Sequence, residues 1–304
     1  MFQSVAEEYG AKMSMAPPRI FDRIAYRARR RRAALLNGDH FLAKEAADQI
    51  ALRLVAVTRR FARGLDLHSR ARIFPILEPI ARSWVRTGYA WDAPTVIADE
   101  EALPFADGSF DLVTSVLSLH SVNDLPGALL QIRRVLKPDG LFMGALFGGD
   151  TLKELRLAFA AAEEATLGGA SPRVAPFLDV RDAGGLLQRA GFALPVADVE
   201  RTVVHYRHLR SLFEDLRALG ETNVLVHRRP SMISNRIFGA LLGEYGLNDE
   251  GKFPATFDIV YLTGWAPHES QQKPLAPGSA QTRLAEALGT VEQKAGDKVP
   301  PRKL

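Results

Sequence analysis

The spacing of apolar residues predicts one long helix followed by an alternating series of strands and helices. Between residues 41 and 62, apolar side chains recur every three or four positions, which indicates an amphipathic helix packed against a sheet. This stripe consists of Leu42, Ala46, Ile50, Leu54, Val57 and Phe61. Short β-type runs follow at 64–67, 83–89, 95–98, 111–117 and 141–147. Strands that alternate with helical segments favour an α/β fold with a mostly parallel sheet and helices on both faces.

The helix between the last two of these strands has clear sequence boundaries. Asn123 or Asp124 supplies its N-cap, and Pro126 lies in its first turn, where no intrahelical N–H is needed. The run Lys-Pro-Asp-Gly at 137–140 ends the helix, because proline cannot continue it and Asp-Gly favours a turn. We therefore expect the chain to turn at 137–140 before the next strand begins.

The second half of the chain combines further helices with two strands. Helical patterns occur near 152–167, 180–190, 209–219 and 232–242, a strand-like run at 196–206, and a late, antiparallel strand at 257–265. We expect a helical insertion at about 151–245. The predicted organisation is a basic N-terminal extension at 1–40, one main domain at 41–267, and a disordered tail at 268–304, where polar residues and proline dominate.

Composition narrows the classes of protein. The chain has 304 residues, 47% of them hydrophobic, so it can bury a full core. The net charge of +4 is concentrated in a few places, so nucleic acid is not implied. Cysteine does not occur, which excludes disulfides, cysteine nucleophiles and thiolate metal sites.

The apolar runs and the N-terminal residues bear on location. No run of about 18 apolar residues occurs, so we expect no transmembrane helix. Glu7 and Glu8, without an apolar segment beside them, argue against a secretory signal. We expect a cytoplasmic protein, with peripheral association at the inner face of the membrane left open. Met13 and Met15 also leave the translation start open.

The densest run of charge lies in the N-terminal extension. It consists of Arg27, Arg29, Arg30, Arg31 and Arg32. One interpretation is a solvated helix face, and the other is docking onto an acidic partner.

Four segments occur in the order found in class I S-adenosylmethionine-dependent methyltransferases. They are ADEEALPF at 98–105, SFDLV at 109–113, LSLH at 117–120 and LKPDG at 136–140. With FGGDTLKELR at 147–156, GETN at 220–223 and GW at 264–265, the chain most resembles the respiratory complex I assembly factor branch, which is arginine hydroxylase-like and neighbours the malonyl-carrier-protein methyltransferases. The resemblance covers about residues 20–270 and implies a Rossmann-like class I methyltransferase fold for the main domain.

The resemblance implies a site for S-adenosylmethionine at the carboxyl ends of the first strands. The residues expected there are Asp66, His68, Asp99, Glu100, Leu117 and Ser118. In such sites, glycines after the first strand let the backbone approach the ligand. Here His-Ser-Arg-Ala-Arg stands at 68–72, so we expect a cramped or empty cavity. Arg70 and Arg72 would bring positive charge toward a sulfonium cation, or meet the cofactor's carboxylate.

The acidic positions of this site are only partly retained. By the resemblance, Asp99 accepts from the adenine amino group, and Asp66 organises the pocket or serves a structural role. Glu100 is expected to face solvent or to cap a helix. No Asp or Glu occurs at 81–90, although an acidic residue at the end of the second strand normally binds the ribose hydroxyls.

Two residues are candidates for catalysis. His120 follows the strand expected at 111–117, where open α/β sheets bind ligands, and serves as a base, a polar contact or a structural hydrogen bonder. Asp150 follows Gly148 and Gly149 and either caps the next helix or faces a substrate arginine. We expect no metal site, although the arginine hydroxylation proposed for the family ordinarily demands a redox metal or another oxidant.

Three functions follow from these observations. The first, implied by the resemblance, is an assembly factor with a methyltransferase-like fold that grips a complex I subunit as its protein client and supports modification of an arginine. The second is a working methyltransferase that acts on a protein or a carrier-bound acid. The third is a non-catalytic binding protein.

Overall fold

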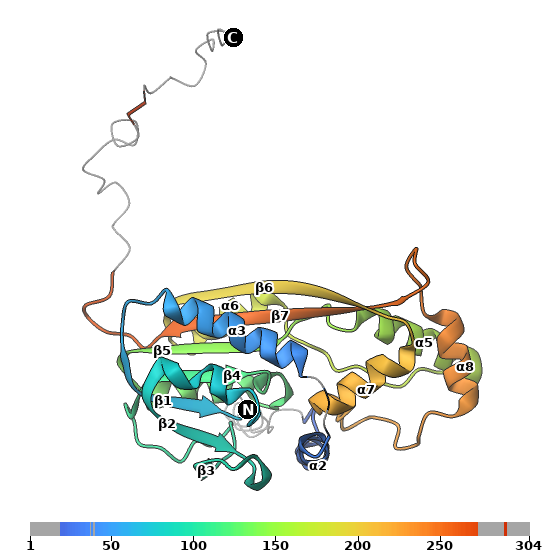
Figure 1. Cartoon of the computed structure of the whole chain (residues 1–304), viewed down its shortest axis with the longest axis horizontal. Helices are drawn as coiled ribbons and strands as arrows, with labels where there is room; N and C mark the ends of the chain where they lie inside the picture. Colours follow the sequence, from blue (N-terminus) through green and yellow to red (C-terminus); the bar gives the residue numbers. More distant parts are fainter. Residues whose placement is uncertain (1–18, 37, 39, 273–288, 291–304) are drawn as a thin grey trace, which may run out of the picture. The chain divides into compact units, whose positions relative to one another are not determined.

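A seven-stranded sheet lies at the centre of Met1–His268, the first of two units into which the chain divides; the second is Glu269–Leu304. The computed structural model describes residues 19–36, 38, 40–272 and 289–290. The strand order is β3-β2-β1-β4-β5-β7-β6 (Figure 1). The strands are β1 (Phe61–Leu67), β2 (Ala81–Gly88), β3 (Val96–Ile97), β4 (Phe110–Val116), β5 (Leu136–Phe147), β6 (Ala193–Tyr206) and β7 (Phe253–Trp265).

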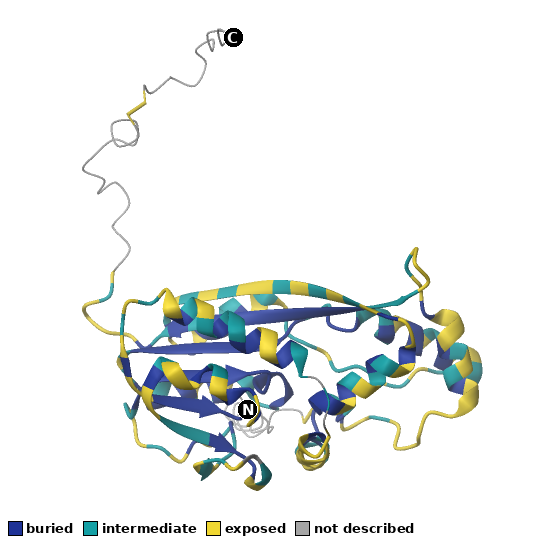
Figure 2. Ribbon diagram, in the orientation of Figure 1, coloured by how far each residue is buried: buried dark blue, intermediate teal, exposed yellow. Residues whose placement is uncertain are grey.

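The sheet is mostly parallel, as expected. Strands β1 to β5 pair in parallel with their neighbours among themselves, and β7 runs antiparallel to both β5 and β6. Figure 2 shows that the central strands are buried, whereas β6 at the edge alternates between exposed and covered residues. The late antiparallel strand is therefore confirmed, and the α/β, Rossmann-like arrangement with it.

Helices cover both faces of this sheet. The α-helices of the described residues are α2 (Arg23–Ala34), α3 (Phe41–Val55), α4 (Leu125–Val135), α5 (Lys153–Leu167), α6 (Val180–Arg189), α7 (Leu209–Leu219) and α8 (Asn235–Glu244), and all but α2 contribute to two apolar clusters. Side chains of α3, α5, α7 and α8 share one apolar cluster with Leu112 of β4, while α4 and α6 share another with Val113. Successive strand residues point to opposite faces, so these two neighbours belong to different halves of the core.

Two predicted boundaries are wrong. The helix expected at 41–62 ends at Val55, and Phe61 instead opens β1, where it pairs with Ala81 of β2. The turn expected at 137–140 lies inside β5 as an irregularity of the strand. The pairing with β4 shifts from Phe110↔Leu136 to Leu112↔Leu141. Between these two pairs the chain advances by five residues in β5 but by only two in β4, so β5 contains extra, unpaired residues there.

Other local expectations are confirmed. The Asp124 side chain accepts from the Gly127 backbone N–H at 2.8 Å and caps α4. Gly168 ends α5 with φ of +70°, a conformation that favours glycine. The segment 151–245 contains α5, α6, α7 and α8, but also the sheet strand β6. The first 18 residues, with Met13 and Met15, and most of the expected tail lie outside the described residues.

Candidate functional site

The end of β1 is joined to the end of β3 by the side chain of His68. Its Nε2 lies 2.8 Å from the carbonyl oxygen of Ala98, which follows β3. Since β2 lies between β1 and β3, the imidazole crosses the carboxyl end of β2, and there it meets the Tyr89 ring edge-on at 4.8 Å. His68 has φ of +56°, in the left-handed region that favours glycine. A bulky ring thus stands where the superfamily has a glycine turn.

Glu100 is the buried centre of an ion-pair network at this edge. Its carboxylate is fully buried, accepts a hydrogen bond from Arg23 of α2, and lies 3.7 Å from Nδ1 of His68. The expectation that Glu100 faces solvent or caps a helix is therefore wrong. Arg23, 77 residues away in the sequence, supplies the opposite charge that allows a carboxylate to lie in the interior.

Asp99 keeps part of its surface exposed, yet arginines of α2 already bind it. Its Oδ2 accepts from Arg27 at 2.8 Å, and Arg23 lies 3.6 Å from Oδ1. Burial raises the pKa of Asp99, but the Glu101 backbone N–H and these two arginines outweigh it and lower the pKa overall. The carboxylate is ionised and paired without any ligand.

Asp66 lies inside the sheet, and its side chain is enclosed. It is fully buried; the Thr114 hydroxyl donates to its Oδ1 at 3.4 Å, and the Arg86 Nε lies 3.9 Å from its Oδ2 as an ion pair. Burial is the largest influence and raises the pKa of Asp66 to about 6. This placement supports a structural role in the strand.

Ser118 ties the end of β4 to β1, and the Leu117 backbone N–H ties it to β5 by donating to the Ala145 carbonyl oxygen at 2.9 Å. Both are fully buried, and the Ser118 hydroxyl donates to the Leu67 carbonyl oxygen at 3.2 Å and lies 2.8 Å from the Ser115 hydroxyl. Leu117 has φ of +48°. Both residues stand at the expected edge of the sheet, but their side chains are enclosed.

Helix α2 covers the ends of β1 and β2 (Figure 1). Tyr26 is buried beside Tyr89, and Arg30 is buried and donates to the carbonyl oxygen of His68 at 3.0 Å. The interpretation of the arginine run as a solvated face is thus wrong for Arg30, although Arg27 and Arg31 are exposed. The helix acts as a cover whose inner side fills the edge of the sheet.

These residues do not fit S-adenosylmethionine in this conformation. A ribose needs an acceptor at the end of β2, where Tyr89 stands, and the methionine end needs the space that His68 occupies. Of the residues expected to contact the cofactor, only Asp99 is partly exposed, while Asp66, His68, Glu100, Leu117 and Ser118 are buried. The cleft is filled by side chains of the chain itself.

Arg70 and Arg72 do not approach this cleft as expected. Arg70 is buried and donates to Glu221 Oε1 at 2.9 Å, at the end of α7, while Arg72 is exposed. Arg70 therefore supports a different site through Glu221, although it does not itself line that site's cavity.

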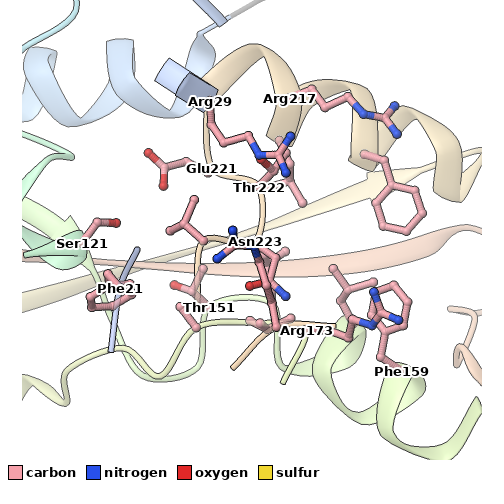
Figure 3. Close-up of a pocket in the computed structure, with 18 of the residues that line it drawn as sticks. Phe21, Arg29, Ser121, Thr151, Phe159, Arg173, Arg217, Glu221, Thr222 and Asn223 are labelled. Carbon is pink, nitrogen blue, oxygen red and sulfur yellow. The ribbon is translucent and has the colours of Figure 1, made fainter. Parts of the chain in front are cut away.

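That site is a cavity of about 430 Å³ beyond β4 and β5, under α2 and α7 (Figure 3). Its polar end is formed by His120 and Glu221, whose Nε2 and Oε2 atoms lie 3.0 Å apart. Burial would raise the pKa of Glu221, but His120 first, then Arg70, lower it to about 2. Glu221 was missed as a site residue; only the GETN motif at 220–223 marked it.

His120 and Asp150 do not come together. The His120 ring packs 4.8 Å from Phe147 and 5.9 Å from Phe177, and lines the cavity. Asp150 is outside the lining and forms ion pairs with Arg201 at 2.6 Å and Lys153 at 3.7 Å. The capping role expected for Asp150 is also wrong, because the N-cap residue of α5 is Leu152.

Neither a metal-binding cluster nor a membrane-spanning helix occurs in the described part of the chain. Within residues 19–36, 38, 40–272 and 289–290, no cluster of three or more His, Cys, Asp or Glu side chains is arranged to hold a metal ion. None of the helices in these ranges is long and apolar enough to cross a membrane.

The sequence matches known proteins over most of its length. A family model described as a methyltransferase domain matches residues 77–144. The human protein named arginine-hydroxylase NDUFAF5, mitochondrial, is 41% identical over 278 residues, which cover 86% of this chain and 79% of that protein. A malonyl-[acyl-carrier protein] O-methyltransferase of Laribacter hongkongensis is 35% identical, covering 82% of this chain and 90% of that protein.

Solved structures agree on the fold. The YcgJ protein of Bacillus subtilis has a TM-score of 0.51 at 14% identity and covers 72% of this chain and 98% of its own. A putative methyltransferase of Bacillus halodurans gives the same TM-score and identity, with 73% of this chain and 99% of its own covered. At this identity the likeness supports the arrangement of strands and helices only.

Proposed function

The chain belongs to the arginine-hydroxylase NDUFAF5 family within the class I S-adenosylmethionine-dependent methyltransferase superfamily, and on that basis we propose that it acts in the assembly of respiratory complex I. In this proposal, a complex I subunit is the client, and a segment of it enters the cavity at His120 and Glu221. In this proposal the chain works in the cytoplasm, with peripheral association at the inner face of the membrane left open.

One observation carries the choice of site. The cleft that holds the cofactor in the superfamily is closed by His68 and α2, whereas the neighbouring cavity of about 430 Å³ remains open. A cavity of this size lies within the range of about 300 to 1,000 Å³ that is usual for ligand sites, so it can take a side chain of a client. The fold therefore serves as a scaffold for client binding, and the family name supports modification of a client arginine. Insertion of oxygen into a C–H bond of arginine consumes an oxidant, so that step requires a co-reactant besides the residues of the cavity.

A methyltransferase acting on a protein or carrier-bound acid is the second candidate. The likeness to a malonyl-[acyl-carrier protein] O-methyltransferase favours it. It requires that S-adenosylmethionine binds, and hence that α2 and His68 leave the cleft. Binding of S-adenosylhomocysteine to the purified protein separates the two candidates.

Deletion of the gene tests the assembly role. We expect less assembled complex I on native gels and lower NADH:quinone reductase activity in membranes, both restored by the wild-type gene. Normal assembled complex I in the deletion strain would exclude the proposal. Mass spectrometry of complex I subunits then tests modification: an arginine-containing peptide should lose one oxygen atom in the deletion strain. If assembly depends on the gene and no peptide changes mass, the non-catalytic alternative holds.

A further inference from the structure

The cavity at His120 and Glu221 is surrounded by arginines. Six of them line it, from α2, from the loop before α6, from α7 and from the loop after α7: Arg29, Arg32, Arg173, Arg217, Arg228 and Arg229. Among the described lining residues, Glu221 is the single carboxylate. Figure 3 shows Arg29 and Arg217 on one side of the cavity, and Arg173 with Thr151 on the other.

Part of this charge is already neutralised. Arg173 pairs with the buried Glu163, and Arg228 pairs with Asp22 at 2.8 Å. Glu221 is likewise satisfied, because Arg70 and His120 hold its two oxygens. Glu221 therefore does not offset the remaining arginines.

Four arginines of the lining have no acidic partner among the described residues: Arg29, Arg32, Arg217 and Arg229. Across the described part of the chain, no carboxylate lies within 4.0 Å of any of them. Burial, and then the positive charges of Arg32 and Arg228, lower the pKa of Arg29. Uncompensated like charges around one opening are relieved by an anion, and guanidinium groups bind carboxylates in a bidentate manner.

The floor of the cavity has a different character. It is aromatic: Phe159 stacks on Phe213 at 6.2 Å, and Phe147 lies 5.8 Å from Phe177. At the mouth, Met232 is 92% exposed. An inorganic anion would leave this apolar surface unused, whereas a peptide brings apolar and charged side chains together.

We propose that the cavity binds an acidic segment of the client protein. One aromatic or large aliphatic side chain of the segment occupies the phenylalanine floor, and aspartates or glutamates on either side pair with Arg29, Arg32, Arg217 and Arg229. This inference rests on the proposed function, because it assigns the client. An arginine in the client then lies next to acidic residues, since a basic segment would be repelled by the rim.

Labelled synthetic peptides test this with the full-length protein. The first probe carries one Phe between runs of Asp and Glu, the second replaces Phe by Ala, and the third replaces the acidic residues by Lys. Fluorescence anisotropy should show the first probe binding at least about tenfold more tightly than the other two. Its affinity should fall as salt is raised, because rim charges are screened. Equal binding of the lysine peptide would overturn the proposal.

Arginine variants assign the binding to the cavity. Arg29→Gln with Arg229→Gln should weaken the acidic peptide about tenfold. Arg181→Gln with Arg189→Gln, on the exposed side of α6, removes the same charge outside the cavity and should leave the affinity unchanged. If the first pair does not fold, Arg229→Gln alone, in an exposed loop, is expected to weaken binding severalfold. Equal losses in both pairs would indicate a general charge effect and contradict the proposal.

Competition distinguishes other occupants. Neither anionic phospholipid vesicles nor single-stranded RNA should displace the acidic peptide, and displacement by either would overturn the assignment to a peptide. Failure here is distinct from failure of the proposed function: deletion of the gene would still lower assembled complex I, while the client would bind at another surface.

Discussion

His68 and Ala98 are joined by a hydrogen bond of 2.8 Å that crosses the end of β2. The bond places an imidazole where the methionine end of the ligand lies in proteins of this superfamily. Arg30 of α2 stabilises the turn after β1 by donating a hydrogen bond to the carbonyl oxygen of His68. Closure of the cleft thus depends on one side chain after β1 and on one helix.

Replacing His68 by glycine should open the methionine end of the cleft. Glycine adopts φ of +56° without strain and removes the ring that contacts Tyr89. We expect S-adenosylhomocysteine to raise the melting temperature of His68→Gly but not that of the wild-type protein. Leu194→Gly is the matched control, because Leu194 also has a positive φ, of +48°, but stands at β6. A ligand-induced shift in Leu194→Gly or in the wild type would contradict this reasoning.

Arg23 should be needed to keep Glu100 in the interior. Arg23→Met leaves a fully buried carboxylate without its guanidinium, so we expect the free energy of unfolding to fall by about 3 to 5 kcal/mol in urea denaturation. The double variant with Glu100→Gln should regain much of the lost free energy of unfolding, because the buried charge is gone. Arg27→Met removes an exposed partner of Asp99 and should cost about 1 kcal/mol or less. If Arg23→Met and Arg27→Met lower the free energy of unfolding equally, the loss in Arg23→Met does not come from the unpaired charge of Glu100.

Asp66 should make the protein less stable as the pH rises through the mildly acidic range. Its folded pKa of about 6 exceeds the ordinary 3.8, so the folded state holds the proton more tightly. The resulting stabilisation is present below about pH 4 and is lost as the pH rises to about 6. Asp66→Asn should lack this decline and be at least as stable as wild type at pH 7. The urea midpoints of Asp66→Asn and the wild type at pH 4 and pH 7 measure this change in stability. If Asp66→Asn is much less stable than the wild type at pH 7, the fold requires the charged form of Asp66.

Glu221 should stabilise the protein with the opposite pH dependence. Its folded pKa of about 2 lies below the ordinary 4.5, so its contribution is present above pH 4.5 and is lost as the pH falls toward 2. Glu221→Gln should lower the free energy of unfolding at pH 7 by about 3 kcal/mol. The difference from wild type should shrink at pH 3. Glu214→Gln, exposed on α7, should change little at either pH, and a constant Glu221→Gln effect between pH 7 and pH 3 would contradict the ion-pair account.

Local chemistry explains which parts of the fold were predictable. The cap at Asp124, the stop at Gly168 and the strand at β2 depend on residues near each other in the sequence. The end of α3 was misplaced because Phe61 continues the helical spacing while its own partner, Ala81, lies in another strand. Periodicity alone cannot tell these two environments apart.

The candidate site depends on contacts between distant residues. Arg23 and Glu100 are 77 residues apart, and His120 and Glu221 are 101 apart. Sequence motifs placed His68, Asp99 and His120 at the correct edge of the sheet, but they did not reveal that α2 returns to cover it. The sequence predicts a solvent-facing or capping position for Glu100, because nothing near it in the sequence indicates that Arg23 of α2 is its partner. Burial of a charge follows from tertiary packing, which no local pattern contains.

Titration of the purified wild-type protein with S-adenosylhomocysteine by isothermal calorimetry tests the closed cleft most directly. A malonyl-[acyl-carrier protein] O-methyltransferase serves as the positive control. If the cleft is closed, this chain should give no binding heat at ligand concentrations up to about 1 mM. A dissociation constant of about 1 mM would correspond to a binding free energy of only about 4 kcal/mol. Saturable binding with a dissociation constant in the micromolar range would contradict it.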